Sequence, residues 1–182
     1  MSELSSVHPN GFKLAMRTLV GGVTIVAAKD ANGSYVGLTA TAVCSLSVDP
    51  PSLIVCVNKQ AGLAEALGAG HHFSLNILTA AQEPVARAFG GLTAARGVGR
   101  FTFGNWHRGS TEVPILSKAR ANLECVTEEV IEKFTHLIVI GRVVAVRLDQ
   151  PGDAGLAADN GTMVPVTHPA ELLAAQLADK IA

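Results

Sequence analysis

Apolar and polar residues alternate along the chain from Val36 to Val48, where every even position is apolar and the odd positions are mostly small and hydroxylated. This period of two predicts one continuous β-strand with a buried face. The other face carries no Lys, Glu, Gln or Arg between Gly37 and Ser47. A flat polar ring can therefore lie against its backbone and hydroxyl groups. The alternative is a threonine-rich strand that faces a second sheet layer. Asp49-Pro50-Pro51 ends the strand, because proline has no N–H to donate to a ladder.

The same patterning predicts further elements on both sides of this strand. Asn10 is placed to cap a helix whose apolar residues follow one helical face, namely Phe12, Ala15, Met16, Leu19 and Val20. Short helices are predicted at Gly62–Leu67 and Thr79–Phe89, where Thr79 and Gln82 fit a capping box. Pro84 sits late for that start, and the alternative is a helix that begins at Gln82 or Glu83. Further strands are predicted at Val23–Ala28, Leu53–Val57, Phe73–Leu78, Ala121–Val126 and His136–Leu148.

Four segments are predicted to lie outside strands. Gly90–Gly109 is a loop anchored by aromatic residues, Glu128–Phe134 is a connection, Gln150–Val166 is irregular, and His168-Pro169 opens a last helix. The turn residues Asp30–Gly33 predict a hairpin, so the sheet is antiparallel. These elements predict a mainly β fold with peripheral helices, in one domain over residues 1–182, as a barrel or sandwich.

Composition narrows the possible partners of the 182-residue, 18.8 kDa chain. A net charge of −1 argues against broad binding to nucleic acid or to an anionic membrane surface. No apolar run approaches the ~18 residues of a membrane span, and the first ten residues do not resemble a signal peptide. A hydrophobic content of 48% suggests a second buried surface, such as a dimer interface. Three cysteines without C-x-x-C spacing predict buried free thiols in a reducing cytoplasm.

Motifs for several kinds of chemistry are absent from the sequence. The chain contains no G-x-G-x-x-G after a strand, no phosphate-binding P-loop and no G-x-S-x-G elbow. Of six histidines only His71 and His72 are close, and neighbours on a strand face opposite ways, so no metal site is predicted. A small barrel with a hydroxyl-rich face is better suited to holding a cofactor than to acid–base catalysis.

Two segments of the chain carry a family resemblance. G-L-T-A-T-A-V-C-S-L-S-V-D-P-P at Gly37–Pro51 and L-I-V-C-V-N-K at Leu53–Lys59 resemble the short-chain flavin reductases, which have an FMN-binding split-barrel fold. These proteins are the reductase partners of two-component flavin monooxygenases. Order and spacing hold over about residues 12–146, through Phe73–Leu78, Ala86–Gly91, Arg100-Phe101 with Trp106, Pro114–Leu116, Ala121–Cys125 and His136–Val143. Residues 150–182 diverge from the family pattern.

The resemblance implies roles for particular residues. Residues beside the flavin ring are implied to be Thr39, Ala40, Thr41, Ala42, Val43 and Ser45, and the segment Cys56, Val57, Asn58 and Lys59 is implied to border its ribityl chain and phosphate. Phe89 is implied to lie near the flavin and His136 by the nicotinamide. Core packing is the alternative for Cys56, Phe89 and His136, and an Asx turn is the alternative for Asn58.

The chain also departs from the family pattern. Many relatives carry Gly-Asp before the histidine, whereas this chain has Phe134-Thr135. Gln60, Ala61 and Gly62 stand where a phosphate-binding Ser, Thr or Lys is common. The cations that can replace it are Lys59, Arg87, Arg96 and Arg100, and Lys59 and Arg100 are taken as the candidate cofactor-binding residues.

The resemblance implies a dimeric, cytoplasmic NAD(P)H-dependent reductase of FMN or FAD, using NADH or NADPH, that supplies reduced flavin to a partner monooxygenase. Hydride transfer needs no protein acid or base, which agrees with their absence from the motifs. One alternative is a flavin-binding carrier or sensor without efficient turnover, favoured by Phe134 and the divergent tail. Another is a split-barrel oxidase that acts on an organic substrate.

Overall fold

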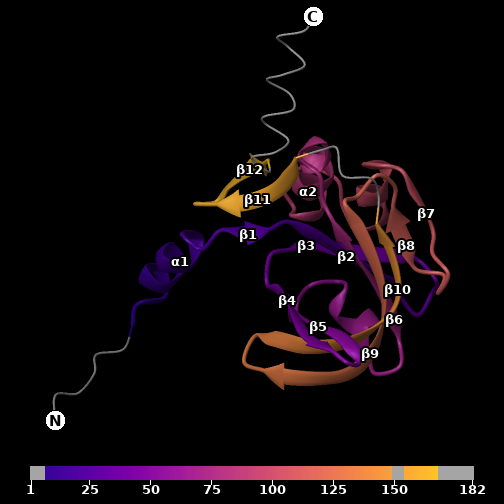
Figure 1. The fold of residues 1–182 in the computed structure, drawn as a ribbon. Coiled ribbons are helices and arrows are strands. Elements are labelled where there is room, and N and C mark those ends of the chain that lie inside the picture. Colours follow the sequence, from indigo (N-terminus) through magenta and orange to yellow (C-terminus); the bar gives the residue numbers. More distant parts are fainter. Residues whose placement is uncertain (1–6, 149–153, 168–182) are drawn as a thin grey trace, which may run out of the picture.

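Seven antiparallel strands form the main sheet of the computed structural model, which describes residues 7–148 and 154–167. Their order across the sheet is β3-β2-β6-β9-β10-β5-β4 (Figure 1). The strands are β2 (Thr24–Lys29), β3 (Tyr35–Ala40), β4 (Val43–Val48), β5 (Pro51–Asn58), β6 (His72–Ile77), β9 (Ala121–Lys133) and β10 (His136–Leu148).

The long strand predicted at Val36–Val48 is interrupted. Residues up to Ala40 pair with β2, and residues from Val43 pair with β5, so Thr41 and Ala42 connect the two edges of the sheet. The alternation could not reveal this, because a period of two records which face a residue occupies and not which strand it pairs with. The two edge strands, β3 and β4, therefore follow each other in the chain through this connection. The predicted antiparallel split barrel with peripheral helices is therefore confirmed.

Strands β9 and β10 form a longer hairpin than the sequence predicted. His136 pairs with Lys133, and pairing continues to Leu148 opposite Ala121, with irregularities near Gly141 and Ala145. The prediction that Glu128–Phe134 is a connection is therefore wrong for residues 128–133. Charged residues can occupy this part of the strand because it lies mostly exposed at the end of the sheet. The paired ends of β9 and β10 form the lower edge of the barrel in Figure 1.

The other strands form two small sheets. One contains β1 (Gly21–Gly22), β11 (Gly155–Asp159) and β12 (Thr162–Val166), and the other pairs β7 (Trp106–Arg108) with β8 (Pro114–Leu116). The prediction that Gln150–Val166 is irregular is wrong for β11 and β12. Asn160 and Gly161, with φ of 48° and 80°, make the tight turn between them. The turn residues were visible in the sequence, but the short strands beside them were not.

The helices are short. They are α1 (Pro9–Arg17), α2 (Glu83–Phe89) and three 3-10 segments at Ala64–Leu67, Ala80–Gln82 and Gly97–Thr102. The Thr79/Gln82 capping box is present, and it precedes α2 by one 3-10 turn. His8 rather than Asn10 caps α1, since its Nδ1 accepts from the Asn10 N–H at 3.2 Å. The helix predicted from His168 lies outside the described residues.

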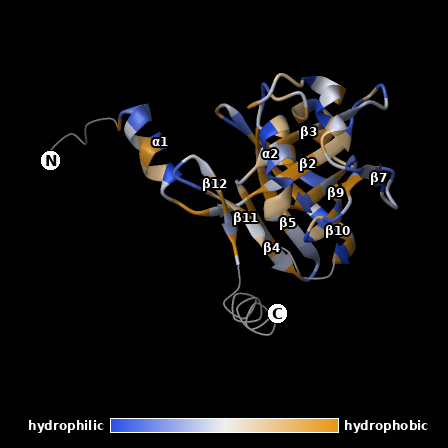
Figure 2. Ribbon diagram, turned by 90° about the horizontal axis from the view of Figure 1, so that it is seen from above, coloured by the Kyte–Doolittle hydropathy of each residue, from blue (hydrophilic) through white to orange (hydrophobic). Residues whose placement is uncertain are grey.

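Helix α1 lies away from the barrel and buries no residue (Figures 1 and 2). Its apolar residues are correspondingly exposed, Phe12 by 60% and Leu14 by 63%. Asn160 donates its N–H to the Arg17 carbonyl at 2.8 Å, which ties the end of the helix to the β11–β12 turn. An isolated helix of nine residues is marginal in water, so its apolar side chains need a further surface.

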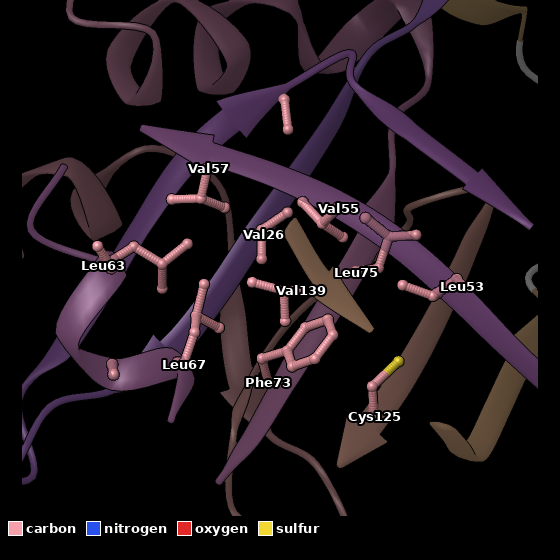
Figure 3. Close-up of a cluster of buried hydrophobic side chains, with 14 residues drawn as sticks. Val26, Leu53, Val55, Val57, Leu63, Leu67, Phe73, Leu75, Cys125 and Val139 are labelled. Atoms are coloured by element: carbon pink, nitrogen blue, oxygen red, sulfur yellow. The ribbon is translucent and has the colours of Figure 1, made fainter. Parts of the chain in front are cut away.

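Two clusters of buried side chains hold the barrel together. The first fills the barrel, and Figure 3 shows Val26, Val55, Val139, Leu75 and Phe73 converging there. A Cβ at Gly141 would lie 2.5 Å from the Phe73 ring, so this strand position requires glycine. The second cluster packs α2 and the loop aromatics against the outer side of β2. Together they fix β3, β5 and β10 around the Thr41–Ala42 connection.

Candidate functional site

The Thr41–Ala42 connection is open to solvent. Both residues are exposed, and Cys56 donates its N–H to the Ala42 carbonyl at 3.0 Å, which holds the connection against β5. Within residues 7–148 and 154–167, neither Thr41 nor Ser45 makes a side-chain hydrogen bond. The connection therefore presents short hydroxyls and little-covered backbone, which are the donors and acceptors that suit the edge of a flat polar ring.

Hollows lie on both sides of the connection. One of 690 Å³ is lined by Thr41, Ala42 and Val43 together with Gly21, Gly22 and residues of α1. The other, of 500 Å³, is lined by Val43, Cys44 and Ser45 together with mostly apolar residues of β5, β6 and β10. Both volumes fall in the range of small-molecule sites. The connection thus forms a ledge between two open spaces.

A second group of predicted residues lies at the end of β5. His136 pairs with Asn58 across the sheet, and Lys59 donates its N–H to the Thr135 carbonyl at 3.0 Å. Asn58 Oδ1 accepts from the Gln60 N–H at 2.9 Å, which is the Asx turn named above as its alternative. Register also places Ile138 opposite Cys56, so His136 lies two residues, roughly 7 Å, along the strand from the level of the connection.

His136 is exposed, so it is not a core histidine. Its Nδ1 lies 2.9 Å from the Thr135 hydroxyl, which leaves Nε2 directed to solvent or ligand. Lys59 forms an ion pair with Glu132 of β9. The sequence did not reveal the contact between Glu132 and Lys59, because the segment Glu128–Phe134 was predicted to be a connection instead of the end of a hairpin.

A third group of predicted residues lies away from the connection and from the end of β5. Thr39 donates its hydroxyl to the Ala86 carbonyl at 2.7 Å, and Arg100 donates Nη1 to the Gly37 carbonyl at 3.3 Å. Phe89 is only 2% exposed and packs on Phe101 at 4.8 Å between centroids. Phe89 is therefore a core residue, which was the alternative to a contact with the flavin. These contacts fasten α2 and the aromatic loop to β3.

Two predicted residues have inward side chains. Ala40 and Val57 are buried in the first cluster, so they can meet a ligand only through their backbone. Cys56 is half-buried and Cys44 is exposed, so the prediction of buried thiols is confirmed only for Cys125. Burial, with the charge of Glu124 beside it, raises the pKa of Cys125 to about 12, which keeps it a neutral thiol.

The four candidate phosphate-binding cations all have protein partners. Lys59 pairs with Glu132, Arg87 with Glu83, and Arg96 donates to the carbonyls of Thr93 and Ala95. Arg100 differs, because its Nε is one of two buried side-chain polar atoms without a hydrogen-bond partner in the described part of the chain. This Nε is enclosed by protein, so a ligand oxygen can reach it only if the surrounding groups move.

The described residues hold neither a cluster of metal ligands nor a membrane-spanning helix. In residues 7–148 and 154–167, no three His, Cys, Asp or Glu side chains group as metal ligands would. In the same residues, no helix has the length and apolar character of a membrane span. The candidate site thus consists of the small uncharged residues of the Thr41–Ala42 connection, with a few cationic side chains around them.

The chain is similar to known proteins, and these similarities identify its family. Residues 16–167 match the model of the family described as flavin reductase like domain. The chain is 32% identical over 151 residues to FMN reductase (NADH) RutF of Pseudomonas syringae, covering 83% of each protein. It is 32% identical over 153 residues to the 4-hydroxyphenylacetate 3-monooxygenase reductase component of Pseudomonas aeruginosa, covering 84% of this chain and 89% of that one.

A solved structure is also similar. The NADH:FAD oxidoreductase SgcE6 of Streptomyces globisporus, in complex with NAD and FAD fragments, superposes with a TM-score of 0.79 at 27% identity. The superposition covers 91% of this chain and 99% of that one. Some relatives are longer, and the chain covers only 43% and 58% of two Rhizobium meliloti proteins that it matches. The resemblance found in the sequence is confirmed.

Proposed function

The chain belongs to the flavin reductase like domain family, and on this premise we propose that it is a flavin reductase, which transfers hydride from NADH or NADPH to FMN or FAD. The observation that carries the proposal is the exposed Thr41–Ala42 ledge, located within the matched residues and beside His136 and Lys59. The relatives named above act as FMN reductase with NADH or as the reductase component of a monooxygenase.

The residues of the ledge suit a flavin ring. We assign the ring to the surface of Thr41, Ala42, Val43 and Ser45, with the backbone of Ala40 and Val57 beside it. A bound flavin accepts and donates the hydride, so the protein's work is to hold the ring and leave one face open. Small side chains achieve this, because nothing between Thr41 and Ser45 is long enough to cover the ring.

The remaining predicted residues receive supporting roles. Cys56, Asn58 and Lys59 border the ribityl chain and phosphate, and Arg100, whose side chain is half-buried, is assigned as a further phosphate-binding cation. Thr39 and Phe89 hold the wall of the site through α2. His136, whose Nε2 has no hydrogen-bond partner in the described residues, contacts the nicotinamide as the candidate catalytic residue.

We propose that the protein is a homodimer. Apolar residues are exposed on one side of β4 and β10 and along α1, among them Leu46, Val48, Val146, Leu148 and Phe12. Leu46 and Val48 lie on β4 and Val146 and Leu148 on β10, and exposed apolar residues that gather in this way favour an interface. A second copy of the chain would cover β4 beside the ledge. Light scattering that reports a monomer at micromolar concentration would contradict this assignment.

Three further assignments complete the proposal. The reductase works in the cytoplasm, in keeping with three free cysteines, and delivers reduced flavin to a partner monooxygenase. Residues 1–182 form one flavin reductase domain. A flavin carrier without turnover is the second candidate, favoured by the large exposed Phe134 beside His136.

A turnover assay separates these candidates. Purified protein is mixed with FMN or FAD and with NADH or NADPH, and the absorbance of the reduced nicotinamide is followed. A reductase consumes nicotinamide continuously in air, since oxygen returns the flavin to its oxidised form. A carrier binds flavin, measured by fluorescence quenching, without such consumption, and that result would overturn the reductase assignment.

A further inference from the structure

Phe134 has an unfavourable backbone conformation. It is the first of the two turn residues between Lys133 and His136, and its φ is +52°. A hairpin turn with positive φ at this position normally carries glycine, since a side chain there is strained. Strain of this kind persists where the surrounding structure imposes it, and it is concentrated at functional sites.

The Phe134 ring is also unusually exposed, by 84%. Lys133 Nζ lies 5.1 Å from the ring centroid, over one of its faces. The other face is therefore open to solvent. An aromatic face with an ammonium group beside it is suited to a ligand that combines a flat ring with negative charge.

The position of Phe134 decides which ligand part can reach it. Along β10 the ledge is level with Ile138, His136 follows two residues further out, and Phe134 lies beyond His136 at the hairpin tip. A flavin ring on the ledge and a nicotinamide at His136 would both lie short of Phe134. The tip instead suits the distant half of a longer molecule that enters the same site.

We propose that Phe134 stacks on the adenine ring of a bound dinucleotide, with Lys133 near its phosphates, and so determines specificity for the adenylate half. This inference rests on the proposed function, because it takes the nicotinamide to lie at His136. NADH and FAD both carry an adenylate, whereas FMN and reduced nicotinamide mononucleotide do not. That difference identifies the source of the adenine.

Two variants test the ring. Phe134→Gly removes it and suits the positive φ, so this variant is expected to fold at least as stably as the parent. Phe134→Leu keeps an apolar side chain on the same strained backbone but has no aromatic face. Val98→Ala, at a residue 61% exposed in the 3-10 segment Gly97–Thr102, is the matched control for loss of exposed apolar surface.

Binding of AMP is measured first by calorimetry, since it requires no turnover. Both Phe134 variants are expected to weaken AMP binding by about 3- to 10-fold, the range expected for one aromatic stacking pair, while Val98→Ala has no effect. With FMN as acceptor, the KM for NADH rises by a similar factor and the KM for reduced nicotinamide mononucleotide does not. If the adenine comes from FAD, the FAD dissociation constant rises instead and that of FMN is unchanged.

Other outcomes overturn the inference. Equal AMP affinity in the parent and both Phe134 variants excludes stacking. A change of oligomeric state in Phe134→Gly would show that the ring belongs to a subunit interface, and a loss seen only in transfer to a monooxygenase would assign it to partner docking. If no variant, nor the parent, reduces flavin, the reductase proposal fails, yet the AMP titration still decides whether Phe134 binds adenine.

Discussion

Two clusters of polar residues in this molecule differ in how far their hydrogen-bonding groups have protein partners. The buried network, Ser74, Asn76, Asn122 and Glu124, lies between β6, β9 and the loops that cover them. Asn76 Oδ1 accepts from the Leu116 N–H and the Asn122 amide, and its own amide donates to the Ile25 carbonyl at 3.1 Å. Glu124 accepts from the N–H and hydroxyl groups of Ser110 and Thr111.

The exposed rim, Thr41, Asn58, Lys59 and His136, has few such partners. Asn58 is held by its own turn and Lys59 by one ion pair, while the hydroxyl of Thr41 and the outer nitrogen of His136 are open to solvent. Hydrogen-bonding groups satisfied in the interior hold elements together, whereas unsatisfied groups at a surface are available to a ligand. Changes in the buried network should therefore alter stability, and changes at the rim should alter binding.

The largest effect is expected from Thr41→Lys. Thr41 is exposed, so the fold tolerates lysine, but a long charged side chain fills the space proposed for the flavin ring. Flavin affinity should fall by about 100-fold or more, which corresponds to about 3 kcal/mol. Fluorescence quenching measures the affinity, and the Tm should change little.

Asn32→Lys is the matched control for this variant, because Asn32 is exposed in the turn at the opposite end of β3. It should bind flavin as the parent does. Parent-like quenching by a folded Thr41→Lys protein would instead remove the ledge from the site.

Glu124→Ala should have the next largest effect, on stability alone. The variant leaves the donors of Ser110 and Thr111 without their acceptor, at a cost of roughly 2–3 kcal/mol. Denaturant unfolding measures this loss, and flavin affinity of the folded protein should be unchanged. Glu129→Ala, at an exposed position of the same strand, should be within about 0.5 kcal/mol of the parent. A comparable loss in both variants would contradict the assigned role of the network.

His136→Ala should have a smaller effect, confined to the nicotinamide. Losing about one hydrogen bond, worth roughly 0.5–1.5 kcal/mol, lowers kcat/KM some 2- to 10-fold while flavin affinity is kept. His72→Ala, at an exposed position on β6, is the control. Unchanged kinetics with both NADH and NADPH in a stable His136→Ala protein would exclude this residue from the site.

The smallest effect is a pH dependence of stability. Burial alone would raise the pKa of Glu124, but the hydrogen bonds from Thr111 and Ser110 outweigh it and lower that pKa below its ordinary value of 4.5. The unfolded chain then binds more protons at acid pH, so the stability from Glu124 is complete above about pH 4.5 and is lost as the pH falls through the folded value. The parent should lose more Tm than Glu124→Gln between pH 6 and pH 3; parallel curves would refute the assignment.

Local patterning determined most of the elements. Strand β10 begins and ends at the residues that the sequence predicted, and the capping box precedes α2 as expected. The family resemblance gave the split-barrel fold before any pairing was known. Strands and helix caps can be predicted from the sequence because the spacing of apolar side chains and the chemistry of a cap depend on residues only a few positions apart.

Only the tertiary structure decided where the long alternating segment breaks. Residues on both sides of Thr41–Ala42 obey one pattern, yet they pair with strands β2 and β5, which are not neighbours in the sheet. The choice of pairing partner depends on contacts across the whole barrel. It opens the ledge, and it also exposes Cys44, which the alternation had placed on a buried face.

The meeting of His136 with Asn58 and Lys59 was likewise decided by register, as was the location of Phe134 at a hairpin tip. The charged residues 128–133 were predicted to form a solvated connection. They are mostly exposed, as predicted, but they form part of β9. A charged segment can remain solvated and still be a strand when it pairs at the end of a sheet. The sequence by itself therefore determined which residues are small, polar or charged, while the fold decided which of them are exposed together at the proposed site.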